Sequence, residues 1–416
     1  MRDYLLEFKT HWRALLSASL GLAAGTISNY INNLFSPSLI EEFGWPRSEF
    51  ALIGLTVVIA AVCLPFAGRI VDRLGTRRMA LIGVAGLPLL FVGLSLQNGD
   101  FRLFFALSLL QMLFVSCIAG ILVYTRLVAR NFTLARGVAL GIASCAPAFA
   151  TAFFSPLLSD FIATEGWRAG YLAMAVFTAV FGAAAILFMP PGSDDQTLVA
   201  TGGAAPAVRY LHVLKTPALL LIFVAILLCN LHFTILTTQI KVVVLDRGVT
   251  PETGSLLVSA FAVGAIIGRL ACGLALDRFS THLVAFVSFA IPGLSLAVLA
   301  SGAPEVLLIG AAVLGLGLAM GAEGDLVVYL AAKYFPRELF SSVLSVFTAG
   351  MAISASLGAL ILSLTLDRTG GYTLFLSMTA VSLMVGALSF LLLPRLAAPQ
   401  AVADHALASS EPGGAS

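Results

Sequence analysis

Arg269 stands in an otherwise apolar stretch, AIIGRLACGLAL (265–276), where packing alone does not explain a cation. A planar guanidinium offers two parallel N–H donors, the geometry that holds a carboxylate through two hydrogen bonds. If the stretch crosses a membrane, a charged side chain there costs about 2.5–3.5 kcal/mol on insertion scales and usually faces a cavity or a partner. Carboxylate binding is therefore the first hypothesis for Arg269.

Two alternative roles compete for this arginine. It could reach the headgroup region, but Asp277 at the polar end of the same stretch is eight residues away. That is about 12 Å along a helix, more than an arginine comfortably spans. It could instead form a purely structural buried pair with Glu323 or Asp325.

Asn29, Tyr30 and Asn33 form a polar stripe within the first apolar run. Asn29 and Asn33 are four residues apart and share one face of a helix. Unpaired amides facing lipid would be expensive, so we expect this face to line a cavity and bind substrate. Helix–helix packing through the amides is the alternative.

The stretch CNLHFTILTTQIK (229–241) is the most polar part of the second half. Asn230 and His232 are expected to line a substrate path and to bind substrate. His232 could carry a coupling proton, because imidazole titrates near neutrality. A lone histidine is more often a hydrogen-bonded packing residue, and this alternative stays open.

Glu323 and Asp325 are the remaining acidic candidates for carrying a proton. Their alternative role is structural: they could form a gate by pairing with Lys333 or Arg337, which follow on the same segment.

The composition of the chain indicates which kind of helices must position these residues. Of 416 residues, 59% are hydrophobic and only 11% charged, against roughly 25% charged in soluble domains. Apolar runs of about 20 residues predict bilayer-spanning helices. The sequence therefore predicts an all-α membrane protein with twelve transmembrane helices, near 14–36, 50–70, 79–97, 102–124, 137–161, 169–190, 217–240, 254–276, 282–301, 304–332, 339–365 and 371–393.

The net charge of +2 gives no support for a nucleic-acid partner. With a cytoplasmic N-terminus, sixteen of the 23 Lys and Arg residues fall in inside segments and six in outside segments. The positive-inside rule then places both termini in the cytoplasm. The five cysteines have neither metal-ligand nor redox spacing, so we expect no metal and no cofactor.

A polar linker, 191–216, divides the chain into two six-helix bundles, 1–190 and 217–395, and a disordered tail is expected over 396–416. GRIVDR (68–73) and GLALDR (273–278) end the second and eighth spans, and ARNF (129–132) and AKYF (332–335) follow the fourth and tenth. These offsets of about 200 residues indicate two pseudo-symmetric halves, an arrangement that places substrate between them near the bilayer midplane.

The loop GRIVDRLGTRR (68–78) closely resembles the signature loop of the major facilitator superfamily. The resemblance implies that superfamily's twelve-helix fold and a gating role for the loop, apart from the substrate site. The matching residues are Gly68, Asp72, Arg73, Gly75, Arg77 and Arg78.

Further segments resemble the monocarboxylate transporters and the related oxalate:formate antiporters: EEFGWPRSEFALIG (41–54), RNFTLARGVALGIA (130–143), EGWRAGYLAMA (165–175) and EGDLVVYLAAKYFPRELFSS (323–342). Two features depart from the animal monocarboxylate transporters. Neutral residues in AGTISNYINNLF (24–35) replace a first-helix lysine, and Ala265 replaces an aspartate one turn before the arginine. The proton-coupling details of that branch do not transfer directly.

This resemblance implies that Arg269, followed by Gly273, binds a substrate carboxylate. It also implies that Tyr124 and Tyr329 contact substrate, with interfacial anchoring as the alternative. The eleventh span (341–364) has no cation to match the lysine of oxalate antiporters. One guanidinium balances one carboxylate, so the sequence favours a monocarboxylate over a dicarboxylate.

We therefore expect a secondary transporter of a lactate- or pyruvate-like anion, coupled to protons by symport and working by alternating access. The alternatives are an organic-anion antiporter or exporter and, from another class, a membrane ligand sensor. The sequence contains no P-loop and no hydrolase motif, so it gives no indication of an enzyme. The expected setting is the inner membrane of a bacterium, with the lipid bilayer as surroundings and the protein as a monomer.

Overall fold

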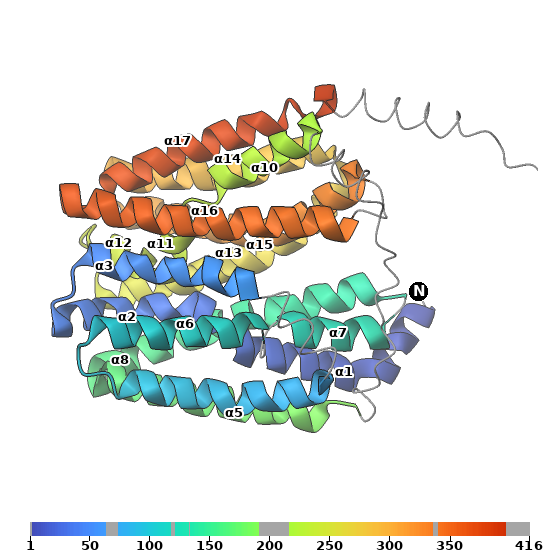
Figure 1. Ribbon diagram of the computed structural model, residues 1–416, viewed down its shortest axis with the longest axis horizontal. Helices are drawn as coiled ribbons and strands as arrows, with labels where there is room; N and C mark the ends of the chain where they lie inside the picture. Colours follow the sequence, from blue (N-terminus) through green and yellow to red (C-terminus); the bar gives the residue numbers. More distant parts are fainter. Residues whose placement is uncertain are drawn as a thin grey trace, which may run out of the picture.

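The computed structural model describes residues 2–63, 74–117, 121–132, 134–190, 216–335 and 340–396, and these form helices joined by short turns (Figure 1). The helices are α1 (Arg2–Thr26), α2 (Ser28–Phe43), α3 (Arg47–Ala51), the 3₁₀ turn η1 (Leu52–Leu55), α5 (Thr76–Ser95), α6 (Phe101–Cys117), α7 (Ile121–Asn131), α8 (Arg136–Phe188), α10 (Pro217–Cys229), α11 (Phe233–Thr238), α12 (Ile240–Leu245), α13 (Pro251–Arg278), α14 (Thr281–Ser301), α15 (Val306–Tyr334), α16 (Phe340–Thr369) and α17 (Thr373–Phe390).

Nine helices within the described ranges are long and apolar enough to cross a bilayer. One of them, α8, carries two expected spans, because Gly166 interrupts it with a φ of 84° that an L-residue rarely adopts. The expected spans 50–70 and 102–124 both run through residues outside the described part of the chain.

The first span is longer than its expected limits of 14–36. It runs from α1 into α2 and ends at Phe43, where Gly44 adopts a left-handed conformation and donates its N–H to the carbonyl of Ile40. Gly44 and Pro46 are the residues that stop this helix.

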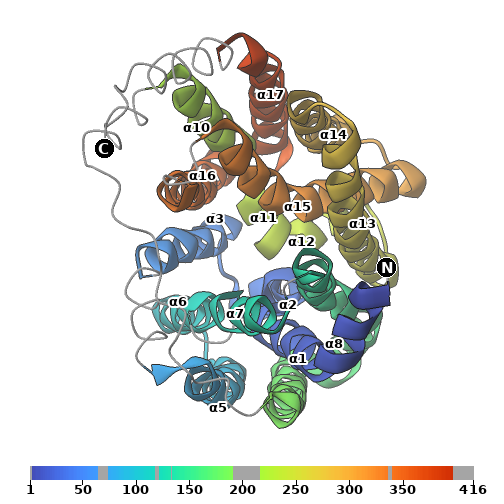
Figure 2. The same cartoon turned by 90° about the vertical axis from the view of Figure 1, so that its right-hand side faces the viewer.

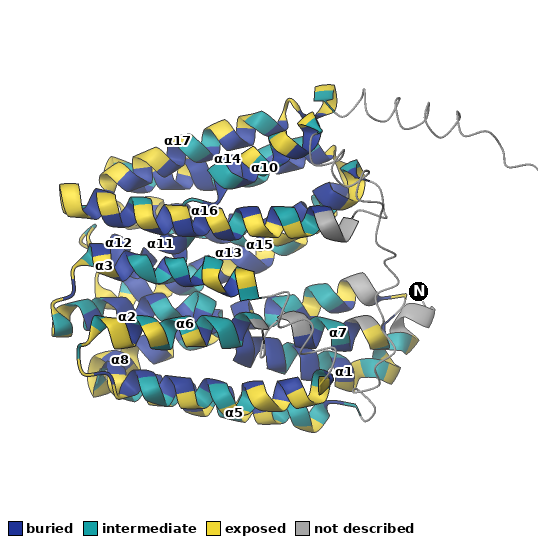
Figure 3. Ribbon diagram, in the orientation of Figure 1, coloured by how far each residue is buried: buried dark blue, intermediate teal, exposed yellow. Residues whose placement is uncertain are grey.

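The outward faces of the bundle are apolar. Leu89 of α5, Leu187 of α8 and Val381 of α17 are 70%, 74% and 64% exposed, and exposed residues recur along the outer helices (Figure 3). A water-exposed surface of this kind would aggregate, whereas lipid solvates it at no cost. The apolar exterior is that of an all-α membrane protein.

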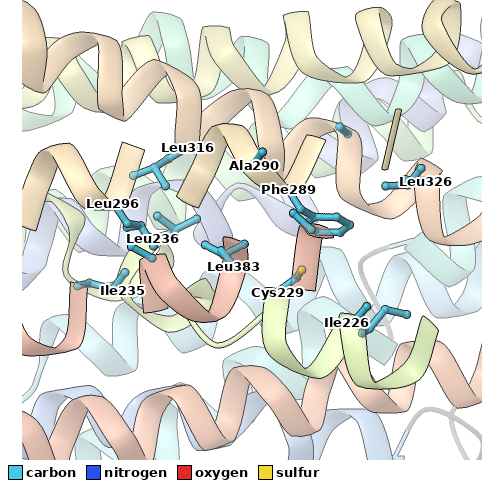
Figure 4. Packing of buried hydrophobic residues seen from close by; sticks show 14 of the residues in the cluster. Ile226, Cys229, Ile235, Leu236, Phe289, Ala290, Leu296, Leu316, Leu326 and Leu383 are labelled. Atoms are coloured by element: carbon cyan, nitrogen blue, oxygen red, sulfur yellow. The ribbon is translucent and has the colours of Figure 1, made fainter. Parts of the chain in front are cut away.

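The helices divide into two halves, α1–α8 and α10–α17, which lie side by side (Figures 1 and 2). Most of the buried apolar residues cluster within one half or the other. In the second half, Cys229 of α10, Phe289 of α14 and Leu383 of α17 belong to one buried cluster (Figure 4). Phe289 also stacks on Phe390 with ring centroids 5.5 Å apart.

The halves contact each other at the end of the bundle opposite the N-terminus. Arg47 Nη2 donates to Asp246 Oδ1 at 2.9 Å, and the Arg47 guanidinium lies 5.6 Å from the centre of the Tyr372 ring. Beside this pair, Lys241 Nζ donates to Ser159 Oγ at 2.8 Å.

Further into the bundle the contact between the halves becomes apolar. Cys145 and Ala148 of α8 pack against Ala265 and Ile266 of α13. This apolar contact ends one turn before Arg269.

Candidate functional site

Four glycines bring α13 and α15 into backbone contact. A Cβ atom added at Gly268 would lie 2.0 Å from the carbonyl oxygen of Leu318, and one at Gly321 would lie 1.9 Å from that of Ala265. Gly264 and Gly317 are similarly close to the opposite helix. Each helix thus has two glycines four residues apart on its contact face, the pattern that lets membrane helices approach closely.

This packing brings Arg269 beside Asp325. Arg269 follows Gly268 directly, and Asp325 lies one turn beyond Gly321, so both side chains emerge where the glycine contact ends. The distance from Arg269 Nε to Asp325 Oδ2 is 3.8 Å, and the two side chains are 22% and 48% exposed. The pair is therefore loose and accessible, and the guanidinium keeps donor capacity for another anion.

Tyr30 and Cys145 lie next to the arginine on the side of the first half. Tyr30 packs against the apolar cluster that contains Cys145 and Ala265, and its ring centroid is 6.5 Å from that of Phe261. Ala265 precedes Arg269 by one helical turn on the same face. Arg269 is close enough to Tyr30 and Cys145 to interact electrostatically with both.

Tyr329 lies one turn beyond Asp325 on α15. Its hydroxyl donates to the carbonyl of Leu276 at 3.3 Å, which ties α15 to the last turns of α13. Lys333 donates to Thr281 Oγ1 at 2.7 Å, and its ammonium lies 5.9 Å from the Tyr329 ring centre. Asp325 pairs with Arg269, one of the alternatives considered for that arginine, whereas Lys333 bonds Thr281. Arg337 lies outside the described residues.

Glu323 sits apart from this pair in a buried position. The side-chain amide of Asn230 donates to Glu323 Oε1 at the interruption between α10 and α11. Glu323 is 7% exposed and Asn230 2%. The structure thus brings these two candidate residues together, and the partner that it gives Glu323 is an amide.

His232 occupies the same interruption. Its Nδ1 atom lies 2.9 Å from the carbonyl oxygen of Cys229, and the side chain is 4% exposed. The ring therefore satisfies a backbone group that the broken helix leaves free.

Tyr124 lies away from Arg269, inside the first half. Its ring rests on the backbone of Gly21, where an added Cβ would be 2.0 Å from Cζ. It is 2% exposed in a cluster of first-half residues that includes Val123 and Ala139. Tyr124 is a packing residue in this conformation.

Asn29 and Asn33 do not join Arg269 either. Asn33 is fully buried and donates to the carbonyl of Tyr30 in its own helix. Asn29 lines a cavity between α2, α6 and α11, together with Ser28, Asn32 and Gln111. The sequence pattern did not single out these last three residues, although Ser28 and Asn32 are four residues apart and share one face of the helix.

The signature loop is described only in part. Gly75 has a φ of 83° and precedes α5, and Arg77 and Arg78 occupy the exposed first turn of that helix. Gly68, Asp72 and Arg73 lie outside the described residues.

The Trp-containing segments 41–54 and 165–175 meet at the end of the bundle opposite the N-terminus. Arg168 Nη1 donates to Glu42 Oε1 at 2.6 Å, and Trp167 Nε1 donates to the same carboxylate. The Arg168 guanidinium lies 4.2 Å from the centre of the Trp167 ring. These contacts fasten α2 to α8 and have no direct link to Arg269.

The described residues contain no group of three or more His, Cys, Asp or Glu side chains that could hold a metal ion. What the arrangement offers is a cation and a carboxylate in loose contact between two helices of one half, facing the other half. Such a pair can exchange partners: an incoming anion competes with Asp325 for Arg269, and a proton on Asp325 weakens the competitor.

Comparison with protein families identifies the architecture. The family model described as Major Facilitator Superfamily matches residues 18–250 and 233–409. No curated protein matches the chain.

Solved structures of transporters share the fold. The nucleoside transporter NupG superposes with a TM-score of 0.73 at 15% identity, covering 92% of this chain and 99% of that one. A D-xylose–proton symporter gives 0.68 at 13% identity, with 93% and 97% covered. A POT family transporter in complex with 5-aminolevulinic acid gives 0.70 at 14% identity, with 92% and 96% covered. At these identities the likeness concerns the fold alone.

Proposed function

This chain belongs to the major facilitator superfamily and is a secondary transporter rather than an enzyme, and we propose that it carries a small monocarboxylate together with a proton. In this proposal Arg269 binds the substrate carboxylate and Asp325 carries the proton. The observation that supports it is the accessible, loose pair between these two side chains, with Nε and Oδ2 3.8 Å apart.

Charge balance explains why the two roles belong together. In the empty carrier, Arg269 and Asp325 cancel each other. When a proton neutralises Asp325 and a substrate carboxylate takes its place, the site again has no net charge. Both states then avoid an unbalanced charge inside the membrane, which would oppose reorientation of the carrier.

Asp325 suits the proton role better than the other two candidates. Glu323 and His232 are nearly enclosed and already bonded to Asn230 and to the Cys229 carbonyl. Asp325 is accessible and contacts the substrate-binding cation directly. Asp325 supplies, from α15, the carboxylate that the animal monocarboxylate transporters place at the position of Ala265.

The substrate is proposed to carry one carboxylate. The eleventh span, 341–364, has no Lys or Arg in its sequence, so Arg269 has no second cation opposite it there. A dianion would leave one negative charge without a partner. Lactate and pyruvate are the simplest anions that fit this restriction.

The transport cycle follows from the contact between the halves. They touch at the end opposite the N-terminus, through Arg47–Asp246 and Lys241–Ser159. If the N-terminus is cytoplasmic, as the charge distribution favours, this conformation is closed to the outside. Rocking of the halves would expose Arg269 to each side in turn.

Uptake into proteoliposomes tests the proposal. We expect radiolabelled lactate or pyruvate to accumulate when an inward proton gradient is imposed, and not when the gradient is collapsed. Oxalate should not be transported. Uptake that requires an organic acid inside the vesicles and ignores the proton gradient would instead identify an antiporter. Absence of transport with any organic acid would overturn the assignment.

A further inference from the structure

The first turns of α1 have two different faces. On one face, Phe8 and His11 pack against Phe132, with ring centroids 5.4 and 5.7 Å apart. On the other face, Leu6 and Lys9 are exposed. The segment is therefore held to the bundle along one face and presents the other to its surroundings.

Glu7 fixes the segment in this orientation. Its carboxylate accepts hydrogen bonds from the backbone N–H groups of Leu134, at 3.3 Å, and Ala135, at 2.7 Å. Ala135 precedes the first residue of α8, where the helix dipole favours a negative charge. The acid is thus turned toward the bundle and is engaged there.

Three exposed cations, Lys9, Arg13 and Arg78, lie on α1 and on the first turn of α5. None of their side chains has a hydrogen bond or an ion pair with another residue in the part of the chain that the structure describes. Lys333, at the same end of the second half, differs because it donates to Thr281. The three positive charges are therefore available to a partner from outside the chain.

The packing of α8 brings these cations into one region. Ala14 of α1, Met79 of α5 and Ala185 of α8 belong to the same buried cluster. Arg13 and Arg78 directly precede Ala14 and Met79. The start of α5 and the end of α8 both lie at the N-terminal end of the bundle (Figure 1). The cations therefore stand on two sides of the last turns of α8.

Trp12 marks the level of this region in the membrane. Its ring lies beside Phe188 of α8, with centroids 6.0 Å apart, and the residue is 50% exposed. A half-exposed tryptophan at the end of a membrane span is typical of the headgroup level. Arg13 and Arg78 each stand one residue before an expected span, so they lie at the same level.

Charge complementarity selects the partner. At the headgroup level the abundant anions are lipid phosphates, and Lys and Arg side chains there are attracted to anionic lipids. A zwitterionic headgroup brings a cation of its own and matches unpaired positive charges less well. We propose that the exposed face of α1 and the start of α5 form a binding site for anionic phospholipids. Lys9, Arg13 and Arg78 contact the headgroups, and Trp12 contacts the start of the acyl chains.

This inference does not depend on the proposed carboxylate transport, because the site lies on the lipid-facing side of the first half. Fluorescence quenching by brominated lipids tests it on the full-length protein in nanodiscs. The chain has two other tryptophans, Trp45 and Trp167, so the emission that is lost in Trp12→Phe is assigned to Trp12.

In phosphatidylcholine discs, brominated phosphatidylglycerol should bind beside Trp12 at least about fivefold more strongly than brominated phosphatidylcholine. Higher salt should weaken this preference, because the charges are exposed. When Lys9→Gln, Arg13→Gln and Arg78→Gln are combined, the two brominated lipids should quench Trp12 equally. These exposed positions make no contact that the fold needs, and an unchanged melting temperature verifies that the variant is folded.

A charge-matched control makes the result specific. Arg102→Gln, Arg278→Gln and Arg368→Gln together remove three exposed cations elsewhere and should leave the preference unchanged. Equal quenching by the two lipids in the wild type would overturn the proposal. So would a preference that survives in the folded Lys9, Arg13 and Arg78 variant, or that falls equally in the control. Loss of the preference on addition of inorganic phosphate would show a site for the free ion and would also overturn it.

Discussion

Arg269 and Asp325 come from two helices whose backbones touch, and their side chains meet where that contact ends. The distance of 3.8 Å between Nε and Oδ2 is longer than a hydrogen bond. Both side chains are partly accessible. A pair made for stability alone would be expected to be closer and more enclosed, so this one is suited to exchanging partners during transport.

Replacing the arginine tests the carboxylate site. Arg269→Lys keeps the charge but loses the two parallel donors, and we expect carboxylate uptake to fall roughly 10- to 100-fold, the equivalent of one charged hydrogen bond. Initial rates in proteoliposomes measure this. Arg278→Lys, in the last turn of the same helix, is the matched control. Uptake by Arg269→Lys at the rate of Arg278→Lys would show that Arg269 is structural.

Neutralising the acid tests proton coupling. Asp325→Asn resembles the protonated residue permanently, so the substrate can still bind Arg269 but the empty carrier has an unpaired cation. We expect exchange of labelled for unlabelled substrate to continue and proton-driven accumulation to disappear. Asp367→Asn, an exposed acid at the end of α16, should retain both activities. Accumulation by Asp325→Asn at the wild-type level would assign the proton to another group.

The glycine contact between α13 and α15 should be sensitive to a single methyl group. Gly321→Ala places a Cβ 1.9 Å from the Ala265 carbonyl oxygen, which forces the helices apart. We expect a loss of about 1–3 kcal/mol in the free energy of unfolding. Thermal denaturation in detergent measures it.

The control for this prediction lies one turn away on the same helix. Gly324 has no atom within 4 Å of an added Cβ, so Gly324→Ala should be neutral or slightly stabilising. Equal melting temperatures for the two variants would mean that the close packing does not contribute to stability.

The Arg47–Asp246 pair should bias the carrier toward the conformation closed at the end opposite the N-terminus. Both side chains are about one third exposed, so the pair contributes only about 0–1 kcal/mol. Arg47→Asp should raise the open population up to about fivefold, and Arg47→Asp combined with Asp246→Arg should restore it.

Spin-label distances between Asn98→Cys and Glu305→Cys, in exposed turns of the two halves, measure this population. Arg102→Asp is the control, because it changes an exposed charge near the same end. If Arg47→Asp and Arg102→Asp change the open population equally, the effect comes from the net charge at this end of the bundle and not from the Arg47–Asp246 pair.

Titration of Lys241 should make closure at the end opposite the N-terminus depend on pH. Burial lowers the pKa of Lys241 to about 8, while Asp160 and Glu252 partly oppose the shift. In an open conformation the exposed amine would regain a pKa near 10.5, so opening takes up a proton between about pH 8 and pH 10.5. Raising the pH through this window should therefore favour closure.

The distance between spin labels at Asn98→Cys and Glu305→Cys measures this shift in the closed population. Lys241→Met keeps much of the length of the side chain and removes the titrating amine, so it should abolish the pH dependence over this window. A wild-type response in Lys241→Met would mean that another group titrates there.

The sequence by itself determined the membrane fold and most of the helices, and it singled out Arg269 as a candidate for substrate binding. Apolar runs, the repeat at about 200 residues and the signature loop are local or periodic features that do not require knowledge of which helices touch. Arg269 can also be recognised from the sequence alone, because it is a cation in an apolar run.

Only the tertiary structure decided which residues surround Arg269. Glu323 and Asp325 are two residues apart on one helix and are equivalent candidates in the sequence, yet they point in different directions. One bonds Asn230 and the other meets Arg269. Helical periodicity gives the angle between two side chains, but the direction of either depends on where the helix packs.

Tyr124 and Gln111 show the same limit. Tyr124 matches a substrate-contacting position of the monocarboxylate transporter branch but rests on Gly21. Gln111 belongs to no motif, yet it accepts a hydrogen bond from Asn32 beside a cavity. Contacts between helices depend on the shapes of both surfaces, and here on the glycines that let backbones approach. A single sequence read along its length does not contain that pairing.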